Sequence, residues 1–333
     1  MELLVLGGTE FVGRAVVEEA LGRGWGVTVF HRGRHGAVRG VAEVLGDREG
    51  ELGGLGEGRW DAVVDTWSGK PGAVRASAGA LAGRVGAYAY VSSASVYVYP
   101  APLGTAEDGP LVAGGDDGYA AVKRGGELAA VGAFGERALL VRAGLILGPY
   151  ENVGRLPWWL NRIARGGDVL APGPRDLPLQ YVDARDLAGW TLDALAAGRG
   201  GPYNVISEPG HTTMGELLAE CVRVTGSSAR LRWAAPEVIA AAGIEPWTQL
   251  PVWLPPGEEH DALHGADVSR ALGAGLRCRP VGETVADTWA WMRGLPGPLP
   301  QRPDRPPVGL DPEVERRVLA GLADAADAKG AAG

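Results

Sequence analysis

A tyrosine and a lysine stand at helical spacing in YAAVK, at Tyr119 and Lys123. On a helix, residues i and i+4 project from one face. A cation beside a phenol lowers the pKa of the phenol toward the working range, so Tyr119 could exchange a proton with a carbonyl or an alcohol. The serine-rich segment VSSASVY (91–97) precedes this pair, and a serine hydroxyl near Tyr119 would polarise the same oxygen.

A second candidate site is the glycine-rich stretch GGTEFVG (7–13), which directly follows the apolar run LLVL. Between a strand and a helix, such a loop presents backbone N–H groups and the positive end of the helix dipole to a pyrophosphate. Glu10 is unexpected there, because a carboxylate beside a diphosphate costs roughly a few kcal/mol at an effective dielectric constant of about 20. We therefore expect Gly7 and Gly8 to make the close approach, Thr9 to cap the turn and Glu10 to point outward.

The segment FHRGRHG, at the end of the second expected strand, bears on the choice of cofactor. It contains His31, Arg32 and Arg34, and the next carboxylate along the chain is that of Glu43. Sites that prefer NAD usually hold the ribose 2′-OH with an acidic residue here, whereas arginine accommodates the 2′-phosphate of NADP. We therefore expect NADP(H) to be preferred, with NAD(H) possible. The alternative interpretation is a solvated basic turn.

The hydrophobic pattern predicts the scaffold for these residues. Apolar runs at 3–6, 27–30, 42–45, 61–66, 88–93 and 137–147 are typical of buried strands, and helix-length connections separate most of them. A further strand and helix are expected in PLQYVDARDLAGWTLDALAAG, with the strand returning to the sheet. The pattern predicts an α/β fold with a Rossmann-like, doubly wound parallel sheet, whose ligands lie at the carboxyl ends of the strands.

The second half of the chain differs in composition: turn-forming residues are frequent, and it contains eight of the eleven tryptophans. We expect residues 1–150 plus about 179–207 to form the dinucleotide-binding domain. A smaller, discontinuous C-terminal substrate lobe would comprise about 151–178 and 208–292. Residues 293–333 would be a proline-rich connector and a C-terminal helix that begins at Asp311-Pro312-Glu313, which has a good N-cap and an N1 proline.

Composition narrows the classes of function. The net charge of −8 argues against non-specific nucleic-acid binding, which needs a basic surface. The two cysteines have no metal-like spacing and fit a reducing compartment without structural disulfides. The apolar run at the N-terminus is too short for a signal peptide or a membrane span. We therefore expect a cytoplasmic protein with a small-molecule substrate and neither a nucleic-acid nor a membrane partner.

Three weaker signals leave alternatives open. His260 and His264, in EEHDALHGAD, have a spacing that could suit a metal, but a polar surface turn is the favoured interpretation, and we expect no metal. Arg175 or Arg185 could hold a substrate diphosphate or could be surface charge. Several tryptophans could line a substrate pocket or pack in the core: Trp158, Trp159, Trp247 and Trp253.

In this order along the chain, GGTEFVG, VSSASVY and YAAVK resemble the extended short-chain dehydrogenase/reductases, the NAD-dependent epimerase/dehydratase family, over roughly residues 1–292. The resemblance implies that Tyr119 is the acid/base and that Lys123 activates it and binds the nicotinamide ribose. It implies Ser93 as the catalytic serine, for which a strand-end cap is the alternative role. Family members often dimerise through the helices around the Tyr/Lys pair, so a homodimer is possible.

The resemblance and the residue patterns together define a cofactor-binding set. Asp47 could accept a hydrogen bond from the adenine amino group, although a plain turn aspartate is an equal alternative. By resemblance, the segment 143–146 passes beside the nicotinamide. With Tyr119 and Lys123, the set comprises Gly7, Gly8, Thr9, Phe11, Val12, Gly13, His31, Arg32, Arg34, Asp47, Thr66 and Trp67.

Two departures from the family pattern bear on the reaction. The 4,6-dehydratases of the family have an Asp-Glu pair after the catalytic threonine, whereas this chain has Ala94-Ser95, which disfavours sugar dehydration. Epimerases generally retain NAD through an acidic residue where this chain has His31. We therefore expect an NADP(H)-dependent oxidoreductase that reduces a carbonyl or oxidises an alcohol. The alternatives are a nucleotide-sugar epimerase with tightly bound NAD and a non-catalytic relative of the chloroplast stem-loop RNA-binding proteins.

Overall fold

The computed structural model describes residues 1–34, 38–302 and 305–331, with side chains of the last helix up to residue 324. The chain divides into two compact units. Unit 1 comprises residues 1–146, 181–208 and 265–278, and unit 2 comprises 147–180, 209–264 and 279–333. The sequence pattern did not indicate that 265–278 belongs with the first unit.

Unit 1 is built on a seven-stranded sheet with the order β11-β6-β5-β4-β1-β2-β3, in which all neighbouring strands are parallel. The chain leaves β1 toward β2 and β3 on one side and later toward β4, β5 and β6 on the other, so the strand order reverses between β1 and β4. This confirms the predicted α/β, doubly wound parallel fold. The strands are β1 (Glu2–Leu6), β2 (Gly26–His31), β3 (Ala42–Leu45), β4 (Trp60–Asp65), β5 (Val85–Ser93), β6 (Ala138–Ala143) and β11 (Gly201–Val205).

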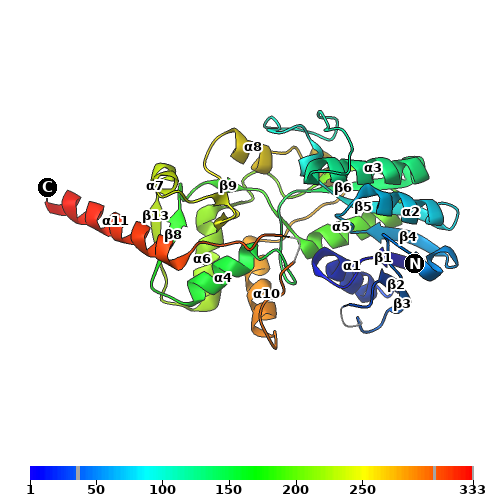
Figure 1. Cartoon of the computed structure of the whole chain (residues 1–333), viewed down its shortest axis with the longest axis horizontal. Helices are drawn as coiled ribbons and strands as arrows, with labels where there is room; N and C mark the ends of the chain where they lie inside the picture. The colour runs from blue at the N-terminus through cyan, green and yellow to red at the C-terminus, as the bar shows by residue number, and fades with distance from the viewer. Residues whose placement is uncertain (35–37, 303–304, 332–333) are drawn as a thin grey trace. The chain divides into compact units, whose positions relative to one another are not determined.

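Helices cover both faces of this sheet, as Figure 1 shows. Helices α1 (Phe11–Gly22) and α5 (Ala184–Ala196) pack on one face, and α2 (Pro71–Leu81) and α3 (Tyr119–Phe134) pack on the other. Successive strand residues point to opposite faces, so Leu3 and Val5 join the first core while Leu4 and Leu6 join the second. Both faces of the sheet are therefore buried in apolar contacts, except along the edge strand β3, which is largely exposed.

The edge of the sheet beyond β5 differs from the sequence expectation. The run 137–147 was expected to form one strand, but β6 ends at Ala143, and β7 (Ile146–Leu147) pairs with β10 (Val182–Asp183) outside the main sheet. Between them, Gly144 passes so close to Ile206 that a Cβ would clash. The strand expected near residue 179 does not return to the main sheet; β11, which was not predicted, supplies the seventh strand.

Unit 2 combines helices with short strand pairs. Its helices are α4 (Arg155–Ala164), α6 (Met214–Thr225), α7 (Pro236–Ala241), α8 (Glu258–His264), α10 (Val281–Arg293) and α11 (Pro312–Ala331). Its strand pairs are β8 (Asp168–Pro172) with β13 (Arg230–Ala234), β9 (Pro178–Leu179) with β12 (Thr212–Thr213), and β14 (Pro246–Trp247) with β15 (Leu250–Pro251). The remaining short helices lie in unit 1: η1 (Gly53–Gly56), η2 (Ala94–Val96), η3 (Gly135–Arg137) and α9 (Ser269–Gly273).

The last helix begins where the sequence predicts. The Asp311 carboxylate accepts hydrogen bonds from the backbone N–H groups of Glu313 (2.7 Å) and Val314 (3.3 Å), which caps α11. One turn later, the buried Glu315 carboxylate accepts from Arg162 Nε at 2.6 Å and from the N–H of Leu170 at 3.1 Å. These contacts hold α11 against α4 and β8 of the same unit.

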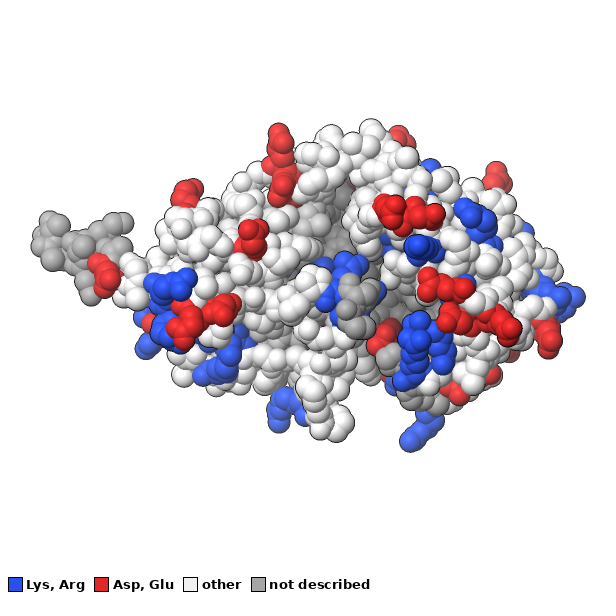
Figure 2. Space-filling model, viewed as in Figure 1, with Lys and Arg blue, Asp and Glu red and all other residues white. Residues whose placement is uncertain are grey.

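Surface charge is mixed in sign. On the face shown in Figure 2, the described Lys and Arg side chains lie among Asp and Glu side chains in small groups, and no single basic area covers that face. Among the described residues, no helix has both the length and the apolar character that a membrane span requires.

Unit 2 contains one carboxyl group in an unusual position. Glu151 is fully buried, and its carboxylate accepts hydrogen bonds from the N–H groups of Arg155 (2.7 Å) and Leu156 (3.2 Å) at the start of α4. Burial raises the pKa of Glu151 to about 7, despite the opposing effect of Arg155 and of these two hydrogen bonds. The carboxyl group therefore takes up its proton more readily in the folded chain than in the unfolded one.

We expect this shift to make stability depend on pH. A raised pKa in the folded state contributes stability that is fully present below the unfolded pKa of about 4.5 and is lost as the pH rises through about 7. Glu151→Gln should remove this loss, which is on the order of 3 kcal/mol. Urea unfolding between pH 4 and pH 8 measures it, with Glu237→Gln, an exposed glutamate of α7, as the control. An unchanged pH slope in Glu151→Gln would contradict the expectation.

Candidate active site

The glycine-rich loop connects β1 to α1, as predicted, and its three glycines have separate reasons to be there. Gly7 has a φ of +109°, and a Cβ on it would lie 2.5 Å from Thr66 Oγ1. A Cβ on Gly8 would lie 2.8 Å from a methyl group of Val17. A Cβ on Gly13 would lie 3.0 Å from both Gly7 O and Gly8 Cα, so this glycine lets α1 pack directly on the loop.

Glu10 stands at the N-cap position of α1, in extended backbone, and its side chain makes no cap hydrogen bond. Its side chain is exposed, and Arg14, on the first turn of α1, pairs with Glu18 at 2.5 Å. The turn itself is closed by the N–H of Thr9, which donates to Gly7 O at 2.8 Å. Because the N-cap side chain accepts no hydrogen bond from the first turn of α1, the N–H groups of that turn can bind an anion.

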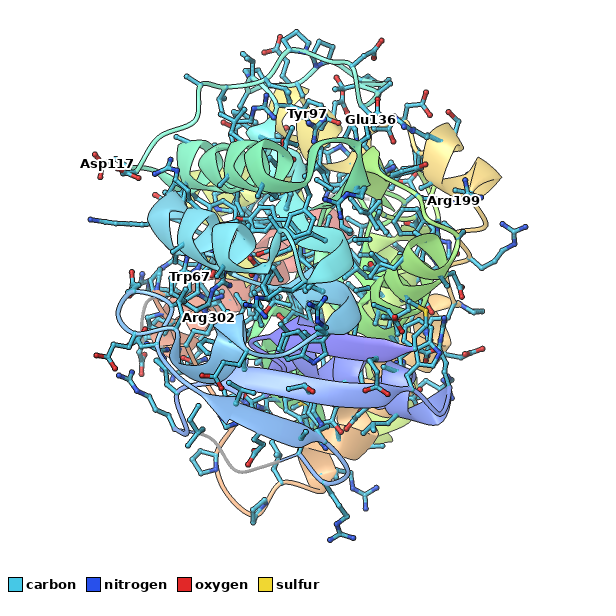
Figure 3. The ribbon with its side chains drawn as sticks, turned by 90° about the vertical axis from the view of Figure 1, so that its right-hand side faces the viewer. Trp67, Tyr97, Asp117, Glu136, Arg199 and Arg302 are labelled. Carbon is cyan, nitrogen blue, oxygen red and sulfur yellow. The ribbon has the colours of Figure 1, made fainter. Side chains whose placement is uncertain are left out.

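Tyr119 and Lys123 occupy the first turns of α3. Tyr119 is the first residue of the helix and is 41% exposed, whereas Lys123 is 3% exposed. The Lys123 ammonium donates to the carbonyl oxygens of Trp67 (2.7 Å) and Val91 (2.8 Å). Figure 3 shows Asp117 where the chain enters α3 and Trp67 in the loop after β4, on the same side of unit 1 in that view. The lysine therefore ties the start of α3 to the carboxyl ends of β4 and β5.

The neighbouring serines Ser92 and Ser93 of VSSASVY have different hydrogen-bond partners. Ser93 ends β5, and its Oγ accepts from the N–H of Ser95 (3.1 Å) and donates to Ser95 Oγ (3.1 Å). This is the strand-end cap that we considered as the alternative role, and it is compatible with a hydroxyl that also meets a substrate. The hydroxyl of Ser92 points elsewhere and donates to the Glu127 carboxylate at 2.8 Å.

A buried network behind the Tyr/Lys pair was not found from the sequence. Glu127 is fully buried on α3 and accepts two hydrogen bonds from Arg142 of β6, at 2.9 and 3.1 Å. Arg142 Nη1 also donates to the hydroxyl of Tyr97 (3.1 Å), which donates to Asn204 of β11 (2.7 Å). Glu127 follows Lys123 by one more helical turn, so continuing the 119, 123 spacing along α3 would have revealed it. The network fixes α3 against the sheet.

A second buried network joins the loops that follow β3 and β4. The Asp65 carboxylate, at the end of β4, binds both terminal nitrogens of Arg48, with Nη2 at 2.7 Å. The same carboxylate accepts from the N–H of Trp67 (2.9 Å) and from the hydroxyl of Tyr88. Arg48 also donates to Ser77 of α2 at 2.7 Å and stacks over the indole of Trp67 at 5.1 Å. Burial and the neighbouring carboxylate raise the pKa of Tyr88 well above its usual value, so it remains a donor.

The residues at the cofactor end have specific partners. His31 Nε2 lies 3.1 Å from the carboxylate of Glu43, so the structure brings beside His31 an acidic group that is remote in sequence. Arg32 and Arg34 are exposed. The Asp47 carboxylate accepts from the N–H of Glu49 at 3.0 Å, which is a turn contact and leaves its adenine role a prediction. The Thr66 hydroxyl donates to Leu6 O at 3.1 Å and holds the β4 loop on β1.

The expected site residues therefore gather in one part of unit 1. The glycine-rich loop follows β1, His31 ends β2, Asp47 follows β3, Thr66 and Trp67 follow β4, and Ser93 ends β5. All of these strands are parallel, so their carboxyl ends form one edge of the sheet, where ligands of doubly wound folds bind.

The positions of His260 and His264 contradict the expected polar surface turn. His260 and His264 were expected in a polar surface turn, but both are buried, with their rings 4.9 Å apart. His260 Nε2 lies 2.9 Å from Pro178 O, and burial lowers the pKa of His264 to about 3, so its ring is neutral. In the described parts of the chain, no group of three or more His, Cys, Asp or Glu side chains could hold a metal ion.

The tryptophans and arginines considered for the substrate site differ in how deeply they are buried. Trp159 and Trp253 are buried, and their indole N–H groups donate to Pro251 O (2.7 Å) and Gly173 O (3.0 Å), so both pack in the core of unit 2. Trp158 and Trp247 are half-buried. Arg185 pairs with Asp183 at 2.8 Å, and Arg175 is exposed.

No family model and no curated protein matches the sequence. Solved structures do match. UDP-N-acetylglucosamine 4-epimerase from Bacillus cereus is 17% identical, with a TM-score of 0.65 over 88% of this chain and 100% of that one. UDP-glucose 4-epimerase from Thermus thermophilus, in complex with NAD, is 20% identical, with a TM-score of 0.63 over 88% and 99%. dTDP-glucose 4,6-dehydratase from Streptomyces venezuelae is 21% identical, with a TM-score of 0.62 over 88% and 97%. The chain therefore has the fold of the epimerases and dehydratases that the sequence resemblance implied.

Proposed function

We propose that the protein is an oxidoreductase of the extended short-chain dehydrogenase/reductase type, which interconverts a carbonyl and an alcohol of a small-molecule substrate with NADP(H). The observation that carries this proposal is the position of Lys123. It is buried at the sheet edge that holds the glycine-rich loop, and it lies one helical turn from the exposed Tyr119.

The residues fit a nicotinamide dinucleotide. Gly7, Gly8 and Gly13 bring the backbone close to the amino end of α1, where N–H groups suit a diphosphate. When bound, the nicotinamide would supply or accept the hydride. The chain's own residues would handle the oxygen and the proton.

In this mechanism Tyr119 gives its hydroxyl proton to the carbonyl oxygen during reduction and takes it back during oxidation. The positive charge of Lys123 favours the phenolate that forms, because a nearby opposite charge stabilises the ionised form of a phenol. Ser93 would orient the substrate oxygen by a hydrogen bond, in addition to its contact with Ser95. Glu127 and the carbonyl of Trp67 keep α3, and with it the Tyr/Lys pair, in place.

The basic residues after β2 support the NADP(H) preference. Arg32 and Arg34 are exposed and follow the strand end at which the adenosine ribose is held in doubly wound folds. We expect Arg32→Ala to weaken NADPH binding by about tenfold and NADH binding much less, because only NADPH has a 2′-phosphate. Titration of cofactor fluorescence measures both affinities. Equal losses for the two cofactors would show that Arg32 does not contact the 2′-phosphate.

A nucleotide-sugar epimerase with retained NAD is the second candidate, favoured by the structural likeness to such enzymes. The deciding experiment is a carbonyl and alcohol substrate screen that follows NADPH absorbance, together with analysis of the purified protein for bound cofactor. Turnover of external NADPH supports the reductase. Stoichiometric NAD retained through purification favours the epimerase, and RNA retention without cofactor binding would overturn both.

A further inference from the structure

We propose that Glu43, held in place by His31, reads the 2′ position of the adenosine ribose, and that Glu43 is the residue that limits the preference for NADP(H). The inference rests on the proposed function, because it needs a dinucleotide at the glycine-rich loop. It adds a selectivity residue from β3 that the sequence pattern does not place near the site.

The first step is the position of His31. The N–H of Gly7 donates to Phe30 O at 3.1 Å, so the glycine-rich loop lies against the end of β2. On the other side, the N–H of Gly46 donates to His31 O at 3.1 Å, so the loop after β3 lies beside the same residue. His31, the last residue of β2, therefore stands between the loop proposed for the diphosphate and the loop after β3. This strand end is where a doubly wound fold holds the adenosine ribose.

The second step is the protonation of the imidazole ring. The N–H of Gly33 donates to His31 Nδ1 at 3.1 Å, and a nitrogen that accepts this bond has no proton. In the neutral ring, Nε2 then carries the proton and donates to Glu43 Oε1 at 3.1 Å. The two hydrogen bonds fix the ring, and its side chain is 9% exposed while that of Glu43 is 36% exposed. The pair thus presents a carboxylate to solvent without a compensating charge on the histidine.

The third step is the effect of the negative charge of Glu43 on the two cofactors. A carboxylate accepts a hydrogen bond from a ribose 2′-OH, which is how acidic residues select NAD. The same carboxylate repels a 2′-phosphate, and a unit charge several ångströms away near a protein surface changes an affinity by about tenfold. Arg32 and Arg34 act in the opposite direction, so the preference between the two cofactors is set by these arginines against Glu43.

Glu43→Gln isolates this effect. Glutamine keeps the size of the side chain and an oxygen for His31, but it removes the negative charge. We expect NADPH to bind about tenfold more tightly and NADH to bind equally or less tightly, so the affinity ratio moves toward NADPH by at least about tenfold. Glu57→Gln, an exposed glutamate after η1 in the same unit, is the matched control and should leave the ratio unchanged.

Both cofactors are titrated by fluorescence with the wild type, Glu43→Gln, Glu57→Gln and Arg32→Ala, and thermal unfolding shows that each variant is folded. A shift toward NADPH in Glu43→Gln alone among the two glutamate variants supports the inference. An unchanged ratio in Glu43→Gln, with both cofactors bound by the wild type, overturns the inference and leaves the proposed function standing. Failure of the wild type to bind either cofactor overturns both.

Discussion

Tyr119→Phe is expected to reduce turnover by about 10²–10⁴-fold while leaving the affinity for NADPH within about twofold of the wild type. Phenylalanine fills the same space at the start of α3 but has no hydroxyl proton to give to the substrate oxygen. Lys123 keeps its hydrogen bonds to Trp67 O and Val91 O, because neither involves the phenol. The loss should therefore fall on kcat.

The measurement is steady-state turnover with a substrate found by the NADPH screen, beside a cofactor titration. Tyr99→Phe is the matched control, since Tyr99 is an exposed tyrosine of the same unit and lies outside α3. Tyr99→Phe should retain the rate of the wild type. Unchanged turnover in Tyr119→Phe would refute the proposed proton transfer, and a parallel loss of NADPH affinity would assign Tyr119 to binding.

Asp65→Ala should lower the free energy of unfolding by about 3–5 kcal/mol. Asp65 and Arg48 are both buried, and removing the carboxylate leaves the guanidinium in the interior with no countercharge at that position. Tyr88 and the N–H of Trp67 lose their acceptor in the same change. The variant should also weaken cofactor binding, because the loops after β3 and β4 are both anchored on this carboxylate.

The double variant Arg48→Met/Asp65→Leu provides the comparison. Apolar side chains of similar volume remove both charges, and such replacements of buried ion pairs are often neutral or stabilising. Urea unfolding should therefore show that the double variant regains most of the stability lost in Asp65→Ala. If Asp65→Ala costs less than about 1 kcal/mol, the ion pair does not organise these loops.

The central sheet and the positions of the candidate site residues in it could be predicted because their signals are local. A short apolar run such as LLVL that is followed by glycines is typical of a buried strand that ends in a tight loop. Helical spacing alone places Tyr119 and Lys123 on one face of a helix. The start of α11 was likewise predicted from Asp311 and Pro312, since an N-cap acts within its own turn.

The buried ion pairs and strand β11 could not be predicted, because they depend on contacts between residues that are distant in sequence. The pairs Arg48–Asp65 and Glu127–Arg142 form only once β4, β6 and α3 are assembled, and many other charges could have paired instead. Glu43 lies 12 residues after His31 in the sequence, so the sequence alone shows only basic residues at the end of β2. Strand β11 was missed because GPYNV is short and contains proline and asparagine, which are depleted in strands.

The attachment of α11 has a consequence for how the chain can be divided. Glu315 supplies the acceptor for the guanidinium of Arg162 and for a backbone N–H of β8, although it follows a long proline-rich stretch. A shortened chain that stops before residue 311 would leave the buried guanidinium of Arg162 without a countercharge, with only the carbonyl oxygens of Gly166 and Asp168 as acceptors. It would also remove the carboxylate that accepts from the N–H of Leu170. The start of α11 is therefore part of the packed interior of unit 2, and a shortened form of the chain should keep it.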